Sequence, residues 1–336
     1  MDERMNKLTT GFVACAGALA SSAAVACASC GCSINSDWGA QGLSDTAGWI
    51  LDLRYDYLNQ NQLRAGRKTI SASDAAATTI PSSGDPAEVE QYTKNHYLTA
   101  TLDYSEGSRW GVSLSLPFIH RSHGTLGSGS DGSSFDPVNG AYTSSGSGLG
   151  DVRLVGRYFG FSDRHDFGIQ LGLKLPTGKK DQIGDDGITN VDPGLQRGTG
   201  TTDLIVGAYY FGDIGADWGY FGQATYQSAL NHSTMAAGSY KPGDSVNLSV
   251  GARYRGWASF VPTVQINVRH AKTDSGDAAD TFATGGTLVY LTLGGMLPVT
   301  EKFAPYVNVQ LPVYQNVNGI QLAPKYTVSV GARYAF

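Results

Sequence analysis

The sequence predicts an all-β protein, a transmembrane antiparallel up-and-down β-barrel of about 12 strands. Two observations predict it: apolar and polar residues alternate along segment after segment, and short connections alternate with long ones. Alternation with period two is typical of a β-strand, and a membrane barrel needs one face for lipid and the other for water. We therefore expect short periplasmic turns at one end and long extracellular loops at the other.

Composition agrees with this fold class and argues against others. The chain has 336 residues, of which 16% are charged and 41% hydrophobic, and it contains 44 glycines and 18 tyrosines. No internal apolar run reaches the roughly 20 residues that a transmembrane helix needs. The formal net charge of -5 provides no basic surface for a nucleic acid.

The first 26 residues are predicted to be a signal peptide. Lys7 makes the beginning positive, the segment from Gly11 to Val25 is apolar and small, and Ala24–Ala26 fits the small-x-small cleavage rule. Cleavage after Ala28 also fits. The mature protein would then be exported to a compartment that permits disulfides. Residues 27–47 show no alternation and are predicted to be a periplasmic arm or plug, and residues 48–336 the barrel.

The predicted arm carries Cys27, Cys30 and Cys32. Three thiolates within six residues could bind a soft metal such as Zn²⁺ or Cu⁺. Alternatively, two of them form a disulfide and leave one free thiol, or Cys27 is acylated as in a lipoprotein. The sequence lacks the CxxCH motif of covalent c-type haem, and we predict no cofactor.

Twelve segments have the pattern of wall strands, and six long connections separate them in pairs. The predicted strands are 49–58, 96–104, 110–118, 150–159, 167–175, 202–211, 218–229, 245–255, 259–270, 286–298, 303–314 and 325–336. The predicted loops are 59–91, 121–148, 177–199, 230–243, 271–284 and 315–324. An even number of strands places both ends of the barrel on the periplasmic side.

Charged side chains in mid-strand fit a wet lumen and not a dry core. In the first strand, for example, Leu53 and Tyr55 face outward while Arg54 lies between them and faces inward. The residues predicted to line the lumen are Asp52, Arg54, Asp56, Asp103, Arg153, Arg157, Lys174, Asp203, Arg253, Arg269 and Arg333. Their mixed signs predict ion pairs across a narrow interior.

The segment from Lys325 to Phe336 alternates throughout, with its aromatic and aliphatic residues on one face. The edge strand of a soluble sandwich would show the same pattern. A final aromatic residue on such a strand resembles the signal by which bacterial barrels are recognised for assembly. We therefore predict that Tyr334 and Phe336 are the signal for the barrel assembly machinery.

Three glycine-rich pieces carry a family resemblance. They are Gly148–Asp151 (GLGD), Leu173–Gly178 (LKLPTG) and Leu195–Asp203 (LQRGTGTTD). Residues 148–336 thereby resemble the outer-membrane barrel family named for the meta-cleavage pathway of phenol degradation. The resemblance implies a transporter in the outer membrane of a Gram-negative bacterium and brings no catalytic residues. The Cys-containing arm is not part of the family's pattern.

Candidate catalytic and metal sites are weak. His232 and Ser233 are adjacent, so on a strand they would point to opposite faces and could not act together. His120 and His123 precede a loop with two aspartates, Asp131 and Asp136, but their spacing is not diagnostic of a protease. The acidic loop with Asp181, Asp185, Asp186 and Asp192 is only loosely similar to a Ca²⁺ loop.

We predict from these observations a channel that passes a small solute passively, with an aromatic compound or a hydrocarbon as the favoured class. The alternative is a structural or adaptor barrel whose Cys-rich arm binds metal or a periplasmic partner. An outer-membrane hydrolase ranks third, and we predict no enzymatic activity. The predicted partners are outer-membrane lipid, the barrel assembly machinery and the small solute itself.

Overall fold

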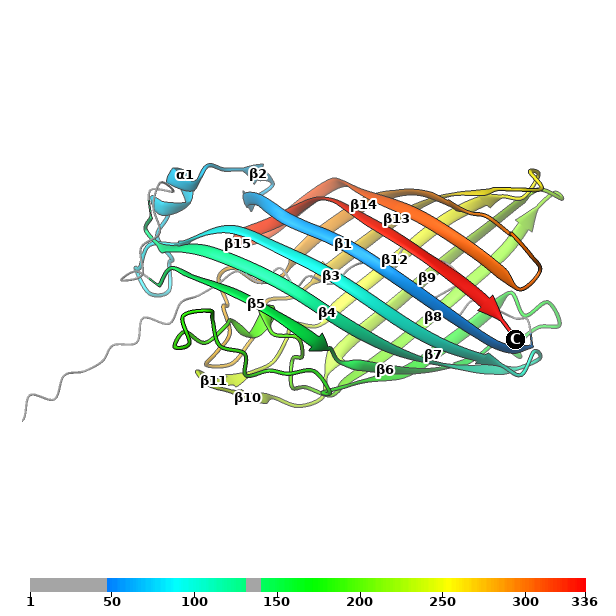
Figure 1. Ribbon diagram of the computed structural model, residues 1–336, viewed down its shortest axis with the longest axis horizontal. Helices are drawn as coiled ribbons and strands as arrows, with labels where there is room; N and C mark the ends of the chain where they lie inside the picture. The colour runs from blue at the N-terminus through cyan, green and yellow to red at the C-terminus, as the bar shows by residue number, and fades with distance from the viewer. Residues whose placement is uncertain (1–46, 131–139) are drawn as a thin grey trace, which may run out of the picture.

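The chain closes on itself as an antiparallel β-barrel (Figure 1). The computed structural model describes residues 47–130 and 140–336. Closure occurs between β1 (Gly48–Gly66) and β15 (Phe303–Ala335), which are paired from Ile50 opposite Ala335 to the far end of β1. β15 passes along the wall twice: its first part pairs with β14 and its second part with β1. The antiparallel fold class predicted from the sequence is therefore confirmed.

The remaining wall strands follow in chain order, each antiparallel to its neighbours. They are β3 (Glu88–Ser105), β4 (Trp110–Ser128), β5 (Tyr142–Leu149), β6 (Val152–Tyr158), β7 (Phe167–Leu175), β8 (Asp203–Ile214), β9 (Trp218–Ala229), β12 (Ser245–Tyr254), β13 (Val261–Ala271) and β14 (Gly286–Met296). β5 and β6 both pair with β4 and form one interrupted strand. Counted in this way, and with β15 taken twice, the wall contains the twelve predicted strands.

The barrel has two different ends. Short turns join the strands at one end, here called the turn end, where the C-terminus lies (Figure 1). The opposite loop end carries the longer connections, together with β2 (Lys68–Thr69), α1 (Ala72–Ala76), η2 (Pro193–Leu195), β10 (Ser233–Met235) and β11 (Gly238–Tyr240). No helix in the described parts of the chain is long and apolar enough to span a membrane.

The outer face of the wall is an apolar belt. Along β7, Phe167, Ile169, Leu171 and Leu173 are exposed, while the residues between them are buried. Other exposed residues of the belt are Leu53, Leu98, Leu116, Leu154, Val206, Val250, Ile266, Leu293, Leu311 and Val330. Water-soluble proteins seldom expose so continuous an apolar surface, whereas a membrane barrel requires it.

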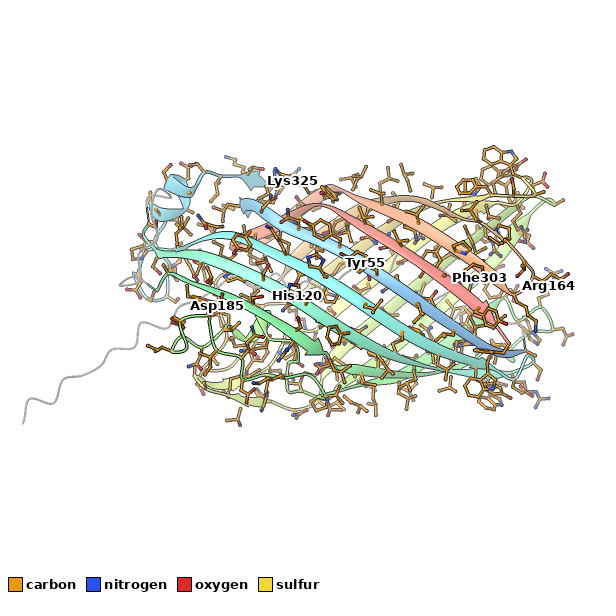
Figure 2. All side chains as sticks on the ribbon, viewed as in Figure 1. Tyr55, His120, Arg164, Asp185, Phe303 and Lys325 are labelled. Carbon is orange, nitrogen blue, oxygen red and sulfur yellow. The ribbon has the colours of Figure 1, made fainter. Side chains whose placement is uncertain are left out.

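Aromatic side chains border the belt. At the turn end the rings of Trp49 and Tyr104 lie 4.8 Å apart, and the ring of Trp110 lies 5.5 Å from Tyr104. Further along the wall, Tyr57 and His96 form a second contact at 5.2 Å. Figure 2 shows Phe303 at the turn end and Tyr55 near the middle of the drawn wall. Aromatic rings at both edges are typical of the two interfaces of a bilayer.

Several predicted loops are wrong in their extent. β1 continues to Gly66 and β3 begins at Glu88, so the loop predicted at 59–91 is shorter. The loop predicted at 121–148 is also shorter, because β4 extends to Ser128 and β5 occupies the last part of the predicted range. The predicted loop at 315–324 lies wholly within β15, where Gly319 turns the chain with a φ of 54°. Beyond the apolar belt both faces of a strand can be polar, so the period-two pattern disappears.

A small apolar core fastens the first long connection to the wall. Ala75 of α1 packs with Ile80, Val89, Leu126 and Ile320, all of them buried. The helix begins with a capping box. The Ser71 hydroxyl accepts the backbone N–H of Asp74, and the Asp74 carboxylate accepts the backbone N–H of Ser71. This connection is therefore part of the folded barrel and not a free loop.

The N-terminal predictions lie mostly outside the described residues. This applies to the signal peptide at 1–26 and to Cys27, Cys30 and Cys32 in the arm at 27–47, of which the structure describes only Ala47. The disulfide, metal and lipid alternatives for the three cysteines stay predictions. The barrel predicted at 48–336 begins with β1 at Gly48.

Leu171→Arg should impair folding far more than Gln170→Arg. The Leu171 side chain is 64% exposed on the belt, and Gln170 is 6% exposed on the inward face. An arginine facing lipid near mid-strand costs about 2–4 kcal/mol, whereas one facing a polar interior avoids that cost. Urea titrations of both variants in liposomes measure the difference. Equal losses of unfolding free energy would show that the facing of β7 is misassigned.

Candidate functional site

The interior of the barrel is polar, and β1 carries its first group of charges. The Tyr306 hydroxyl donates to Asp52, lying 3.1 Å from both carboxylate oxygens. The Arg54 Nε lies 2.9 Å from the Asp56 Oδ2, and the Ser329 hydroxyl donates to the other oxygen of Asp56. All three charged residues are buried. They hold β1 to both passes of β15 from the inside.

A second ion pair spans three neighbouring strands. Arg157 of β6 binds Asp103 of β3 with both terminal nitrogens, at 2.5 and 2.8 Å. β4 lies between them, and its inward residue here is Gly111, where an added Cβ would come within 2.6 Å of the guanidinium. The glycine therefore makes room for the arginine to cross. Both charged residues are buried, so the pair is removed from bulk water.

Lys174 at the loop end of β7 forms a third group. Its Nζ lies 3.0 Å from an oxygen of Asp151 and 3.2 Å from one of Asp203. Asp151 sits in the break between β5 and β6, where it also accepts the backbone N–H groups of Gly178 and Thr199, each at 3.0 Å. The two ends of the connection 176–202 are thereby held at one point inside the wall.

This connection, called the inner loop from here on (residues 176–202), lies against the inside of the barrel. Arg121 of β4 donates to the carbonyls of Gly194 and Gln196, at 3.2 and 3.1 Å. The Tyr142 hydroxyl donates to Asp192 at 2.5 Å, and the Tyr142 ring packs in a buried cluster with Leu195. The inner loop therefore narrows the loop-end half of the lumen.

A cavity of about 280 Å³ remains between the inner loop and the wall. Wall residues from β1 round to β13 line it, and the inner loop contributes Pro193 and Arg197. Arg153 points into it and donates to the Gln227 side chain at 3.2 Å. Arg269 donates to Asn247 at 3.1 Å. The cavity offers a space for a small molecule inside the described barrel.

An aromatic cluster lies inside the turn-end half of the barrel. Phe159, Tyr209 and Phe221 form a buried inward cluster, and Phe211 packs beside it. Inward glycines accommodate large side chains here: a Cβ at Gly251, for example, would lie 2.5 Å from the Phe221 ring. This cluster therefore lies between the cavity and the turn end.

The structure places the eleven predicted lumen residues on the inward face, but in separate groups. Asp103 and Arg157 form one pair, and Lys174 and Asp203 another. Arg253 lies against Gly219 near the turn end, and Arg333 is opposite Asp52 in the register of β1 with β15. Arg54, Arg153, Lys174, Asp203 and Arg269 line the cavity.

Two inward residues, Arg121 and Arg197, were missed by the sequence analysis, whereas the alternation over 150–159 placed Asp151 inward without including it among the predicted lumen residues. Arg121 continues the inward parity of β4, but the strand was predicted to end before it. Asp151 lies at the break between β5 and β6, and Arg197 belongs to the inner loop, where no alternation exists. Of the two missed residues, only Arg121 had a signal in the sequence, namely a strand that continues past the belt.

The residues considered for catalysis serve other contacts. His120 faces outward and bonds with the Ser147 hydroxyl at 2.7 Å, while His123 is buried and bonds with Thr93 at 2.9 Å. His232 is exposed and Ser233 is buried, as expected for adjacent residues of an extended segment. Asp131 and Asp136 lie outside the described residues.

The aspartates considered for Ca²⁺ hold the inner loop together. Asp185 accepts from Thr143 and from the backbone of Ser145, so it covers the free edge of β5. Asp186 caps the backbone N–H groups of the two residues after Gly187. Asp181 pairs with Lys179 at 3.6 Å. Within the described ranges, no three His, Cys, Asp or Glu residues are grouped so that they could hold a metal ion.

No family model and no curated protein matches the sequence. Among solved structures the barrel is similar to an outer-membrane channel from Pseudomonas putida F1, with 12% identity over 87% of this chain and 96% of that chain, at a TM-score of 0.61. It is also similar to the P. putida toluene transporter TodX, with 10% identity over 87% of this chain and 91% of that chain, at a TM-score of 0.45. A third similar structure is the β domain of the Bordetella autotransporter BrkA, with 12% identity over 87% of this chain and 100% of that chain, at a TM-score of 0.47. The first of these likenesses shows the fold.

Glu88→Gln should stabilise the barrel at alkaline pH. Glu88 begins β3 at the loop end, outside the apolar belt, where burial and then the charge of Asp192 raise its pKa to about 8. Unfolding returns this pKa to its ordinary value near 4.5, so the unfolded chain loses the proton first and stability falls as pH rises between the two values.

Glu88→Gln should remove this pH dependence and should raise the free energy of unfolding at pH 8 by on the order of 3 kcal/mol. Guanidinium unfolding in liposomes at pH 5 and pH 8 measures it. Glu301→Gln, at an exposed position in a turn, is the matched control. It should leave the change of unfolding free energy with pH as it is in the wild type. A Glu88 variant with the wild-type slope would contradict the prediction.

Arg157→Met should destabilise the barrel by about 3–5 kcal/mol, because it leaves the buried carboxylate of Asp103 without its partner. Arg255→Met is the matched control. Its pair with Asp213, 2.6 Å long, is partly exposed at the turn end and should be worth less than about 1 kcal/mol. Urea titration of the two variants compares them, and similar losses would mean that the inner pair is not isolated from water.

Proposed function

We propose that this protein is a channel in the outer membrane of a Gram-negative bacterium that passes a small solute passively. The observation that supports this most is a closed wall, apolar outside and polar inside, that encloses a cavity of about 280 Å³. The outward belt suits lipid, and a polar interior suits a solute that crosses in water. The similarity to an outer-membrane channel agrees with the same assignment.

The cavity favours a solute of modest size. Its volume is just below the roughly 300–1,000 Å³ of pockets for drug-sized ligands. Tyr97, Ile119 and Tyr240 contribute apolar surface to it. A single aromatic ring or a short hydrocarbon is therefore the favoured class. The resemblance to the meta-cleavage family, which remains a prediction, points to the same class.

Passage requires local movement at both sides of the cavity. The inner loop covers the cavity from the loop end, held by Arg121 and by Lys174. The cluster of Phe159, Tyr209 and Phe221 lies inside the barrel on the turn-end side of the cavity. We propose that the inner loop is the main restriction, because it is a connection held to the wall by side-chain contacts, while the aromatic cluster is formed by the wall strands and the residue after β6.

The orientation and the partners follow from the same assignment. The turn end would face the periplasm and the loop end the exterior. The ring of Phe336 lies 5.2 Å from that of Tyr334 at the turn end, and both side chains are exposed, so the assembly machinery could reach them. The adaptor alternative rests on the cysteine arm and would require a periplasmic partner.

Replacement of residues 182–196 by Gly-Ser-Gly should raise the conductance of single channels several-fold in planar bilayers. The excised segment contains η2 and the carbonyls that bind Arg121, so the lumen should widen. The control is deletion of Ser82 and Ser83, which lie in an exposed turn of another connection. The wild type should conduct weakly. A wild type and a loop-deleted barrel that are both silent, although folded, would refute the proposed channel.

A further inference from the structure

We propose that the cavity beneath the inner loop is a binding site for a small organic anion, with a carboxylate head and an apolar body. The inference rests on the proposed channel and narrows its solute. Two features of the cavity carry it: arginines whose charges are not balanced within the described residues, and an adjoining apolar surface.

The positive charges of the cavity fall into two kinds. Lys174 is balanced by Asp151 and Asp203, and Lys272 pairs with Asp244 at 3.1 Å. By contrast, three lining arginines, Arg121, Arg153 and Arg197, form no ion pair with any described carboxylate. The first of them is buried, so its charge is largely removed from water.

These arginines contact neutral acceptors. Arg121 donates to the Asn95 side chain at 2.5 Å and to the Tyr97 hydroxyl at 3.0 Å, besides the two carbonyls of the inner loop. Arg197 donates to the carbonyl of Ser147. Arg153 donates to Gln227 at 3.2 Å. A guanidinium with only neutral partners in a confined site favours the arrival of an anion, because an isolated charge is costly to desolvate.

The carboxylates that line the same cavity are already engaged. Asp151 and Asp203 bind Lys174, and Gln227 also donates to Asp203 at 2.6 Å. Asp274 accepts from the Tyr240 hydroxyl and from the backbone of Gly243, both at 2.8 Å. Gln227 thus bonds to both Arg153 and Asp203. The lining keeps an excess of positive charge although the whole chain has a formal net charge of -5.

The rest of the lining is suited to an apolar body and not to a hydrated inorganic ion. Pro117 and Ile119 of β4, Pro193 of the inner loop and Ala229 of β9 share the cavity with the arginines. Arginine binds carboxylate through two parallel N–H groups, which fixes the orientation of the head. The geometry therefore points to monocarboxylates of about the size of benzoate.

The test uses three probes of similar shape: benzoate, benzyl alcohol and benzylammonium. Folded barrel is reconstituted in liposomes for flux and in planar bilayers for reversal potentials. Benzoate should permeate faster than benzylammonium, and a salt gradient should show preference for anions, since a cleft of one sign concentrates the opposite charge. Titration calorimetry of detergent-solubilised barrel with benzoate measures binding independently of passage.

Arg153→Gln is the informative variant, because this side chain is exposed to the lumen and its loss leaves no buried carboxylate behind. It should reduce benzoate flux and affinity on the order of threefold to tenfold and leave benzyl alcohol unchanged. Arg153→Glu should reduce the benzoate flux and the benzoate affinity further. Arg255→Gln, at the turn end and far from the cavity, is the charge-matched control and should behave as the wild type.

Each other result has a definite meaning. Equal permeability for the three probes, with no calorimetric binding of benzoate, would overturn the anion site and leave the channel standing. A variant at Arg153 that slows all three probes alike would also overturn it, because the effect would be steric. Absence of any flux, together with benzoate binding that Arg153→Gln weakens, would support the site and refute the channel.

Discussion

The constraint on which the structure depends is that a wall in lipid can leave no backbone hydrogen-bonding group unpaired. The pairing of β1 with β15 satisfies it for the two strands farthest apart in the sequence. The N–H of Ala335 donates to the carbonyl of Lys302, so the end of β15 is also tied to the turn that precedes it. Closure fixes the register of every strand, and register decides which side chains meet inside.

The polar interior follows from that closure. Once alternate residues must face inward, their charges are enclosed and need partners across strands, not along them. Arg157 reaches Asp103 over β4 because Gly111 has no side chain to block it. Lys174 similarly joins two strands and the base of the inner loop. The ion pairs therefore hold the strands of the wall together from the inside.

The sequence was sufficient for the fold class and for the facing of the strands, and insufficient for the site. The strand count and the inward positions of residues such as Arg54 and Asp203 follow from alternation, which lipid imposes on the belt. Alternation ends where lipid ends, so the loop-end parts of β4 and β15 were predicted as loops. The inner loop could not be predicted, because its position depends on hydrogen bonds between residues far apart in sequence, such as Arg121 with Gly194.

The inward arginines of the barrel differ in their partners. In the turn-end half the buried arginine Arg157 has a carboxylate partner, and the aromatic cluster around Phe221 lies in the same half. In the loop-end half, Arg121 and Arg153 bond to amides, hydroxyls and carbonyls, which are weaker partners for a charge. An incoming carboxylate would compete with the inner-loop carbonyls for Arg121 and thereby loosen the loop that covers the cavity. Binding and opening would then be coupled through one guanidinium, since the group that favours the anion also holds the loop in place.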